Sequence, residues 1–154
     1  MKLTNPINLK AELPAQPENV KFFEVLTAKM QNHNKTSIGF NDVLFCEKTD
    51  VITPDFYVLT KATGNKLGII RSLEENGDFI LESNGTDKDI FPDYRLNIND
   101  FESVYRLISL SRNRSLQVFE IGENWDDFDD VKEWEPETIE DRVTYSNNIA
   151  KYLL

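Results

Sequence analysis

The run of residues 36–83 constrains the fold more than any other part of the chain, because β-type residues alternate there with turn signals. Short runs rich in β-branched and aromatic side chains cover residues 37–40, 43–46 and 56–60. Two turn signals follow, Thr63-Gly64-Asn65 and Asn76-Gly77, each leading into a further apolar run. Asn-Gly is a strong hairpin signal, because both residues tolerate the positive φ of a type I′ turn. The pattern predicts an antiparallel meander of at least three strands.

Two helices are expected to flank this meander. From Pro17 onward, apolar residues recur every three or four positions, which is typical of an amphipathic helix: Val20, Phe23, Leu26 and Met30. After a further short strand at 94–98, Asn99 and Glu102 have the spacing of a helix cap, and an apolar face follows them. That face consists of Phe101, Val104, Tyr105 and Ile108. It predicts a late helix ending near residue 112.

The remainder of the chain predicts one more strand and a helical C-terminal part. Residues 116–121 alternate in polarity like a strand, and Ile139, Val143 and Ile149 mark a C-terminal helix after Pro136. The expected fold class is therefore α+β. It comprises an antiparallel sheet of about four to six strands, an N-terminal helix, one late helix and one or two C-terminal helices. We expect an irregular N-terminal arm over residues 1–16 and a single domain over residues 17–154.

The bulk composition narrows the class of protein. The chain has 154 residues, of which 40% are hydrophobic, which suffices for one core without disulfides. A single cysteine, Cys46, and an N-terminus without a signal-type apolar run favour a cytoplasmic protein. No window has the apolar length of a membrane span. Abundant Asn and few Ala hint at an AT-rich genome, such as that of a phage or a low-GC bacterium.

Residues 120–141 concentrate the charge of the whole chain. This stretch holds eleven of the 27 acidic residues and one of the 17 basic residues, so the rest of the chain is balanced and the net charge of −10 arises here. Both tryptophans also lie in it. Such a charge repels nucleic acid and anionic membranes, so we expect neither direct nucleic-acid binding nor membrane binding. A basic protein is the partner that this stretch would attract.

The spacing within this stretch predicts a short helix with an aromatic side and an acidic side. Trp125, Phe128, Val131 and Trp134 recur at intervals of three, and carboxylates fill the positions between them. The residues expected to contact a partner are Trp125, Asp126, Asp127, Asp129, Asp130, Glu133, Trp134 and Glu135. A plainer interpretation stays open, in which the tryptophans dock the helix on the core and the acids form a solvated face.

Sites of other kinds are weakly signalled. A calcium loop requires Gly at its sixth position, where Lys132 stands, and alternating oxygen ligands that Val131 interrupts. With His33 and Cys46 the only residues of their types, zinc sites and nucleophilic triads are poorly supplied, and Cys46 is better explained as a small core residue. No glycine-rich phosphate loop is present in the sequence. The sequence therefore predicts no cofactor, no metal and no catalytic residue.

The hypothesis that follows is a binding protein, not an enzyme. It would present the ridge of residues 125–135 to a basic surface and could occupy the nucleic-acid site of a nuclease or another nucleic-acid-binding protein. Immunity proteins and phage antagonists, including mimics of nucleic acid, are of this kind. The second hypothesis is a small structural subunit of a larger assembly such as a virion. A carboxylate-dependent enzyme is the third.

Overall fold

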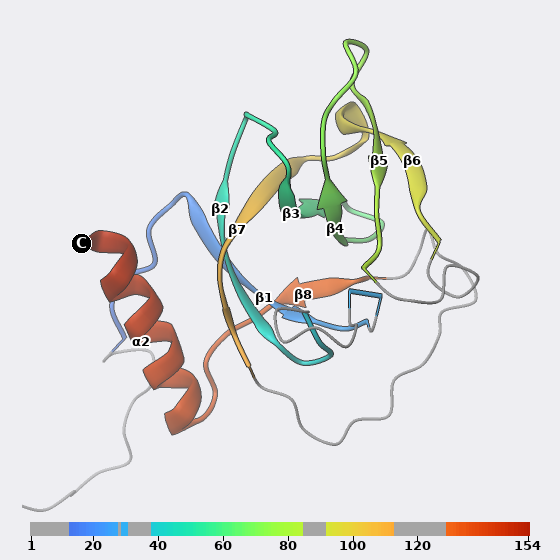
Figure 1. Ribbon diagram of the computed structural model, residues 1–154. Helices are drawn as coiled ribbons and strands as arrows, with labels where there is room; N and C mark the ends of the chain where they lie inside the picture. Colours follow the sequence, from blue (N-terminus) through green and yellow to red (C-terminus); the bar gives the residue numbers. More distant parts are fainter. Residues whose placement is uncertain (1–12, 28, 31–37, 85–91, 113–128) are drawn as a thin grey trace, which may run out of the picture.

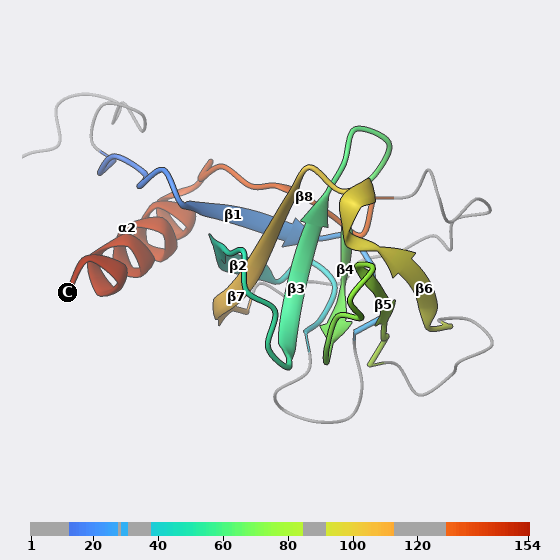
Figure 2. The same cartoon turned by 90° about the horizontal axis from the view of Figure 1, so that it is seen from above.

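The computed structural model describes residues 13–27, 29–30, 38–84, 92–112 and 129–154. The elements in chain order are β1 (Val20–Val25), β2 (Val43–Lys48), β3 (Asp55–Thr60), β4 (Lys66–Ile70), β5 (Asp78–Leu81), β6 (Tyr94–Asn97), the 3-10 turn η1 (Ile98–Asp100), β7 (Ser103–Ser111), β8 (Val131–Glu133) and α2 (Ile139–Leu153). Six strands form one antiparallel sheet in the order β4-β3-β7-β2-β1-β8, while β5 and β6 form a hairpin. The sheet curls around an apolar interior, and α2 packs outside it beside β1 and β2 (Figures 1 and 2).

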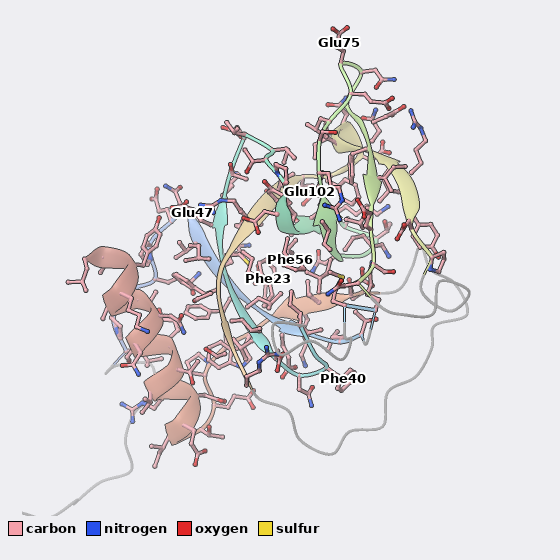
Figure 3. All side chains as sticks on the ribbon, viewed as in Figure 1. Phe23, Phe40, Glu47, Phe56, Glu75 and Glu102 are labelled. Atoms are coloured by element: carbon pink, nitrogen blue, oxygen red, sulfur yellow. The ribbon has the colours of Figure 1, made fainter. Side chains whose placement is uncertain are left out.

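The predicted fold class is wrong in its helices, since within the described residues the curled sheet dominates and only one α-helix, at the C-terminal end, accompanies it. The expected N-terminal helix is strand β1. Phe23 and Val25 point into the interior cluster, whereas Val20 and Phe22 pack on the opposite face against α2. A strand covered on both faces does not alternate between polar and apolar residues. Its run of apolar residues therefore also fits the spacing of three or four positions that is typical of a helix. Figure 3 shows Phe23 and Phe56 inside the curl.

The expected late helix is strand β7, preceded by η1. The turn η1 is capped by Asn97, whose side chain accepts a hydrogen bond from the Asn99 backbone N–H, so Asn99 is not a helix cap. Opposite β2, the register of β7 shifts between Leu107 and Ser109, a β-bulge. Leu107 and Leu110 therefore both pack against the interior although they are three residues apart. The residues that the sequence assigned to one helical face are divided in the strand: Tyr105 packs in the interior, Phe101 and Val104 pack against the cluster of Tyr57 and Phe79, and Ile108 is 39% exposed.

The strand-rich centre of the chain follows the expectation only in part: residues 38–40 are not a strand, β7 lies between β2 and β3, and β5 pairs with β6, so of the expected meander only the β3–β4 hairpin forms a regular strand pair. β3 and β4 form an antiparallel hairpin, and Ile69 of β4 makes an antiparallel bridge with Glu82. The turn before β5 differs from the type I′ turn expected at Asn76-Gly77. Gly77 has φ 90° and its N–H donates to the Glu74 carbonyl, while Asn76 keeps a negative φ. The turn is thus a type I turn followed by a left-handed glycine.

The C-terminal helix is confirmed as α2. The hydroxyl of Thr138 accepts a hydrogen bond from the Asp141 backbone N–H, and the Asp141 carboxylate accepts from the Thr138 N–H, which completes a capping box. Tyr145 and Ile149 bury one side of the helix against β1 and β2. Across the described part of the chain, no helix combines the length and the apolarity that crossing a membrane would require.

Candidate functional site

The structure describes the acidic stretch from Asp129 onward, and this part is not helical before α2 begins at Ile139. Trp125, Asp126 and Asp127 lie outside the described residues. Val131–Glu133 forms the edge strand β8, paired with β1, so the short helix expected up to Trp134 is wrong for this part. The pairing brings Val131 opposite Val25 and Lys132 opposite Glu24. Of the described acids in this stretch, only Glu133 lies in the strand, and Trp134 directly follows it.

Asp129 and Asp130 connect the two edge strands of the sheet. The Asn65 backbone N–H donates to Asp129 Oδ1 over 2.7 Å, and the Asp130 N–H donates to the Asn65 carbonyl over 2.8 Å. The Leu67 N–H donates to Asp130 Oδ2 over 2.9 Å. Since Asn65 and Leu67 lie at the start of β4, these two acids tie β8 to the opposite edge of the sheet. They act as structural links of the fold.

Asp130 is also half of a buried ion pair. Lys29 Nζ lies 2.9 Å from Asp130 Oδ2, and the two residues are 4% and 1% exposed. A charge held this deep requires a partner and further hydrogen bonds, which Lys29 and the Leu67 N–H supply. Asp130 thus faces the interior of the protein instead of a partner.

Trp134 packs in the apolar cluster that lies between the sheet and α2. Its side chain is 9% exposed, and its ring centroid lies 5.3 Å from that of Phe22. The Trp134 N–H donates to the Phe22 carbonyl over 2.9 Å, which continues the pairing of β8 with β1. Tyr145 of α2 belongs to the same cluster. Trp134 therefore joins the strand to the helix and is almost entirely buried.

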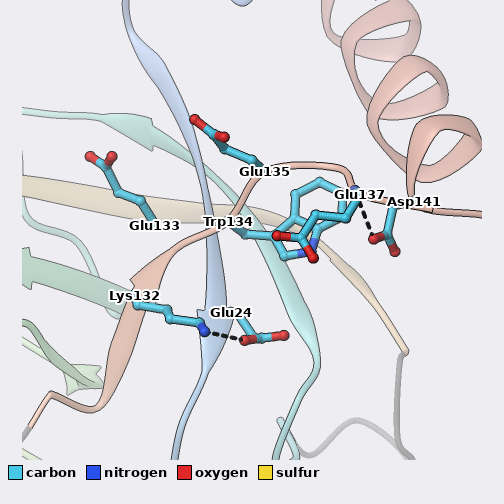
Figure 4. A pocket seen from close by; sticks show the side chains of 7 residues that line it. All are labelled: Glu24, Lys132, Glu133, Trp134, Glu135, Glu137 and Asp141. Atoms are coloured by element: carbon cyan, nitrogen blue, oxygen red, sulfur yellow. Dashed lines mark hydrogen bonds and ion pairs between the residues drawn. The ribbon is translucent and has the colours of Figure 1, made fainter. Parts of the chain in front are cut away.

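An acidic hollow opens beside Trp134 and is the strongest candidate site in the described residues. It has a volume of about 340 Å³ and is lined by Glu24, Lys132, Glu133, Trp134, Glu135, Glu137 and Asp141 (Figure 4). Five carboxylates from β1, β8, the following segment and α2 line the hollow together with one lysine, Lys132, which lies beside Glu24. We call this set of residues the acidic hollow. Four of its residues, Glu24, Lys132, Glu137 and Asp141, were not among the predicted contact residues.

Some carboxylates of the acidic hollow are already engaged. Lys132 Nζ lies 3.3 Å from Glu24 Oε1, across the strand pair. Glu133 accepts a hydrogen bond from Lys21, and this bond, together with the nearby negative charge, raises the pKa of Lys21 above its usual value. Asp141 accepts from the Glu137 and Thr138 backbone N–H groups. Each of these three carboxylates thus has a defined structural partner.

Glu135 and Glu137 differ from the other carboxylates. Over the described ranges, neither side chain makes a hydrogen bond or an ion pair, and both residues are exposed. They lie at the mouth of a site that already carries an excess of negative charge. A cation brought to this mouth would therefore find two carboxylates that are not neutralised within the described chain.

A second hollow, mainly apolar, adjoins the acidic one. Its volume is about 400 Å³, and its lining comprises Leu13, Pro14, Ala15, Gln16, Trp134, Glu135, Pro136 and Tyr145. The N-terminal residues are held in place because the Tyr145 hydroxyl donates to the Pro14 carbonyl over 2.9 Å. Trp134 and Glu135 line both hollows. The two sites therefore form one continuous surface with an acidic half and an apolar half.

The part of the chain that the structure describes shows neither a metal site nor a reactive cysteine. No group of three His, Cys, Asp or Glu side chains there is arranged to hold a metal ion. Cys46 is fully buried in the interior cluster, and burial raises the pKa of its thiol far above the usual value, which agrees with a core role. His33 lies outside the described residues. Comparison of the chain with protein-family models, with curated proteins and with solved structures finds no match in any of the three.

Proposed function

We propose that this protein binds a basic protein partner through the acidic hollow and the apolar hollow beside it. The observation that carries the proposal is the pair Glu135 and Glu137, two exposed carboxylates without partners in the described ranges, at the mouth of a hollow that three further carboxylates line. Like charges gathered around one hollow repel one another, and repulsion that is not compensated lowers stability. A bound lysine or arginine side chain would supply that compensation.

The two halves of the surface have different roles in this proposal. The carboxylates steer a basic partner toward the site and set its orientation, because long-range charge acts mainly on the rate of association. The apolar half, lined by Leu13, Pro14 and Pro136 among others, supplies the area that a partner's side chains cover. Asp129 and Asp130 hold the surface in place without contacting the partner. Among the predicted contact residues that the structure describes, Glu133, Trp134 and Glu135 line this surface.

The class of partner follows from the sign of the charge. Surfaces that bind nucleic acid are basic, so a nuclease or another nucleic-acid-binding protein has the complementary surface. The acids at positions 126 and 127, outside the described residues, would extend the negative face toward such a partner. The protein would then act as an inhibitor that occupies the nucleic-acid site, in the manner of an immunity protein or a phage-encoded antagonist.

The test is a capture experiment with two matched variants. Glu135→Gln/Glu137→Gln removes the two unpaired carboxylates of the hollow, and Glu75→Gln/Glu102→Gln removes the same charge from two exposed positions on the other side of the molecule (Figure 3). Each protein is immobilised and exposed to a lysate, and bound proteins are identified after washes at low salt and at about 1 M salt, where the Debye length is about 3 Å.

The proposal predicts that wild type and the control variant capture a basic protein, that high salt releases it, and that the hollow variant does not capture it. Capture of the same basic protein by all three variants would show that another surface binds it. Capture that high salt leaves unchanged would show that charge does not drive binding. Either result would contradict the proposal.

A further inference from the structure

The outer face of α2 carries an apolar stripe that nothing in the described chain covers. Four of the eight large hydrophobic residues that are exposed in the described ranges belong to this end of the chain: Ile139, Val143, Leu153 and Leu154. Ile139 is 68% exposed and Val143 is 55% exposed. In both views α2 lies at the periphery with this side turned away from the sheet (Figures 1 and 2). The stripe is therefore accessible to a second molecule.

The residues of the stripe lie along one line of the helix. At about 100° per residue, Ile139, Val143, Asn147, Ala150 and Leu154 fall within an arc of about 80°. Tyr145 and Ile149, which bury the inner side, lie on the opposite half of the helix. The spacing of four, four, three and four residues is that of a helix which packs against another helix.

Charged residues beside the stripe indicate what covers it. Glu140 in the first turn and Lys151 in the last turn lie on the same flank of the stripe, eleven residues apart. Both are exposed, and neither makes an ion pair with any residue that the structure describes. They carry opposite charges at opposite ends of one helix. If a second copy of the helix packed antiparallel to the first, Glu140 of each copy would lie beside Lys151 of the other.

We propose that two copies of this chain associate through α2, with the two helices antiparallel about a two-fold axis. In this arrangement Glu140 of one copy lies beside Lys151 of the other, twice, because the two-fold repeats every contact. The midpoint between Glu140 and Lys151 lies within about 1.5 Å of the midpoint of the stripe along the helix, so one axis serves both sets of contacts. The helix dipoles also run in opposite directions, which is favourable.

The interface is self-complementary and closed, so assembly stops at two copies. A single pair of helices of this length covers less than about 1,200 Å² and belongs to the weak class of interfaces, so the dimer forms at raised protein concentration. The inference does not depend on the proposed function. A dimer would display the acidic hollow twice, because Asp141 lies on the inner side of α2 and away from the stripe.

The first experiment is sedimentation equilibrium of the full chain over a range of concentrations. Wild type is expected to follow a monomer–dimer equilibrium. Val143→Glu is expected to weaken dimerisation by at least roughly tenfold, because it places a charge in the stripe. Val51→Glu is the matched control, since Val51 is 67% exposed on the loop between β2 and β3 and does not belong to the stripe, and it should dimerise like wild type. A wild type that stays monomeric throughout, or assembles beyond two copies, would overturn the proposal.

The second experiment tests the antiparallel register by exchanging charges. Glu140→Lys and Lys151→Glu each place like charges together in their own homodimers, so each variant alone should dimerise roughly tenfold more weakly than wild type. Mixed in equal amounts, they restore both Glu–Lys pairs and should form a heterodimer as stable as the wild-type dimer. Circular dichroism checks that both variants keep α2. A mixture that associates no better than either variant alone would overturn the register.

Discussion

Lys29 Nζ and Asp130 Oδ2 lie 2.9 Å apart, although the two residues are separated by 101 positions in the chain and both are buried. Asp130 also accepts the Leu67 backbone N–H, so one carboxylate joins three distant segments. The acid that the sequence placed on an outer surface is therefore an internal link of the sheet. This link brings β8 to the start of β4, and the acidic hollow forms beside β8.

Removing the Asp130 charge should strongly destabilise the protein. Asp130→Asn would leave Lys29 buried without its ionised partner, which typically costs about 3–5 kcal/mol of unfolding free energy. Asp129→Asn is the matched control, because Asp129 is exposed and accepts one backbone hydrogen bond, so its loss should cost about 1 kcal/mol. Urea unfolding measures both. Equal destabilisation by the two changes would contradict the structural role of Asp130.

Cys46 should be unreactive in the folded protein even in mildly alkaline solution. Burial raises the pKa of its thiol above the ordinary value of 9.0, so the folded state keeps the thiol protonated where the unfolded chain loses the proton. This group therefore contributes stability below pH 9, and that contribution falls as pH rises above the unfolded pKa. Alkylation at about pH 9 should proceed only through unfolding and should accelerate in urea. Rapid labelling without denaturant would show that the thiol is accessible.

The contact between β4 and β5 should tolerate no added side chain at Gly68. A Cβ atom at this position would lie 2.6 Å from the buried Leu81 side chain and 2.9 Å from the Glu82 carbonyl oxygen. Gly68→Ala should therefore lower the unfolding free energy by about 1–3 kcal/mol. Adding Leu81→Ala should relieve part of the clash. The double variant should therefore lose less unfolding free energy than the sum of the losses in the two single variants. Additive effects would argue against this close approach.

The parts of the fold that were predictable are those encoded by local chemistry. The Gly-containing turns around the β3–β4 hairpin and before β5, and the cap and apolar positions of α2, specify their structure within a few residues. β1 and β7 were not predictable in this way. β1 is buried on both faces by partners far away in sequence, and β7 places Tyr105 in the interior while Val104 packs against a different cluster. Only the tertiary structure reveals these causes.

The candidate site was likewise predictable where local sequence specifies it, and not where residues distant in the chain form it. The sequence located the acidic stretch, and Glu133, Trp134 and Glu135 do line the hollow. Glu24 could not be assigned to it, because it reaches the site through the register that places it opposite Lys132. Nor does the sequence distinguish Asp130 from its neighbours, since its buried position depends on Lys29 and Leu67. Sequence alone could identify the charge of this surface, but not which carboxylates remain without partners.

The most direct test of the central claim measures stability and partner capture on the same variant, Glu135→Gln/Glu137→Gln. If the two carboxylates serve binding and not folding, their removal relieves repulsion in the hollow, so urea unfolding should show an unfolding free energy equal to or slightly above that of wild type. Capture of the basic partner should be lost at the same time, while Glu75→Gln/Glu102→Gln retains it. Lower stability of the hollow variant, or capture equal to that of the control, would contradict the account.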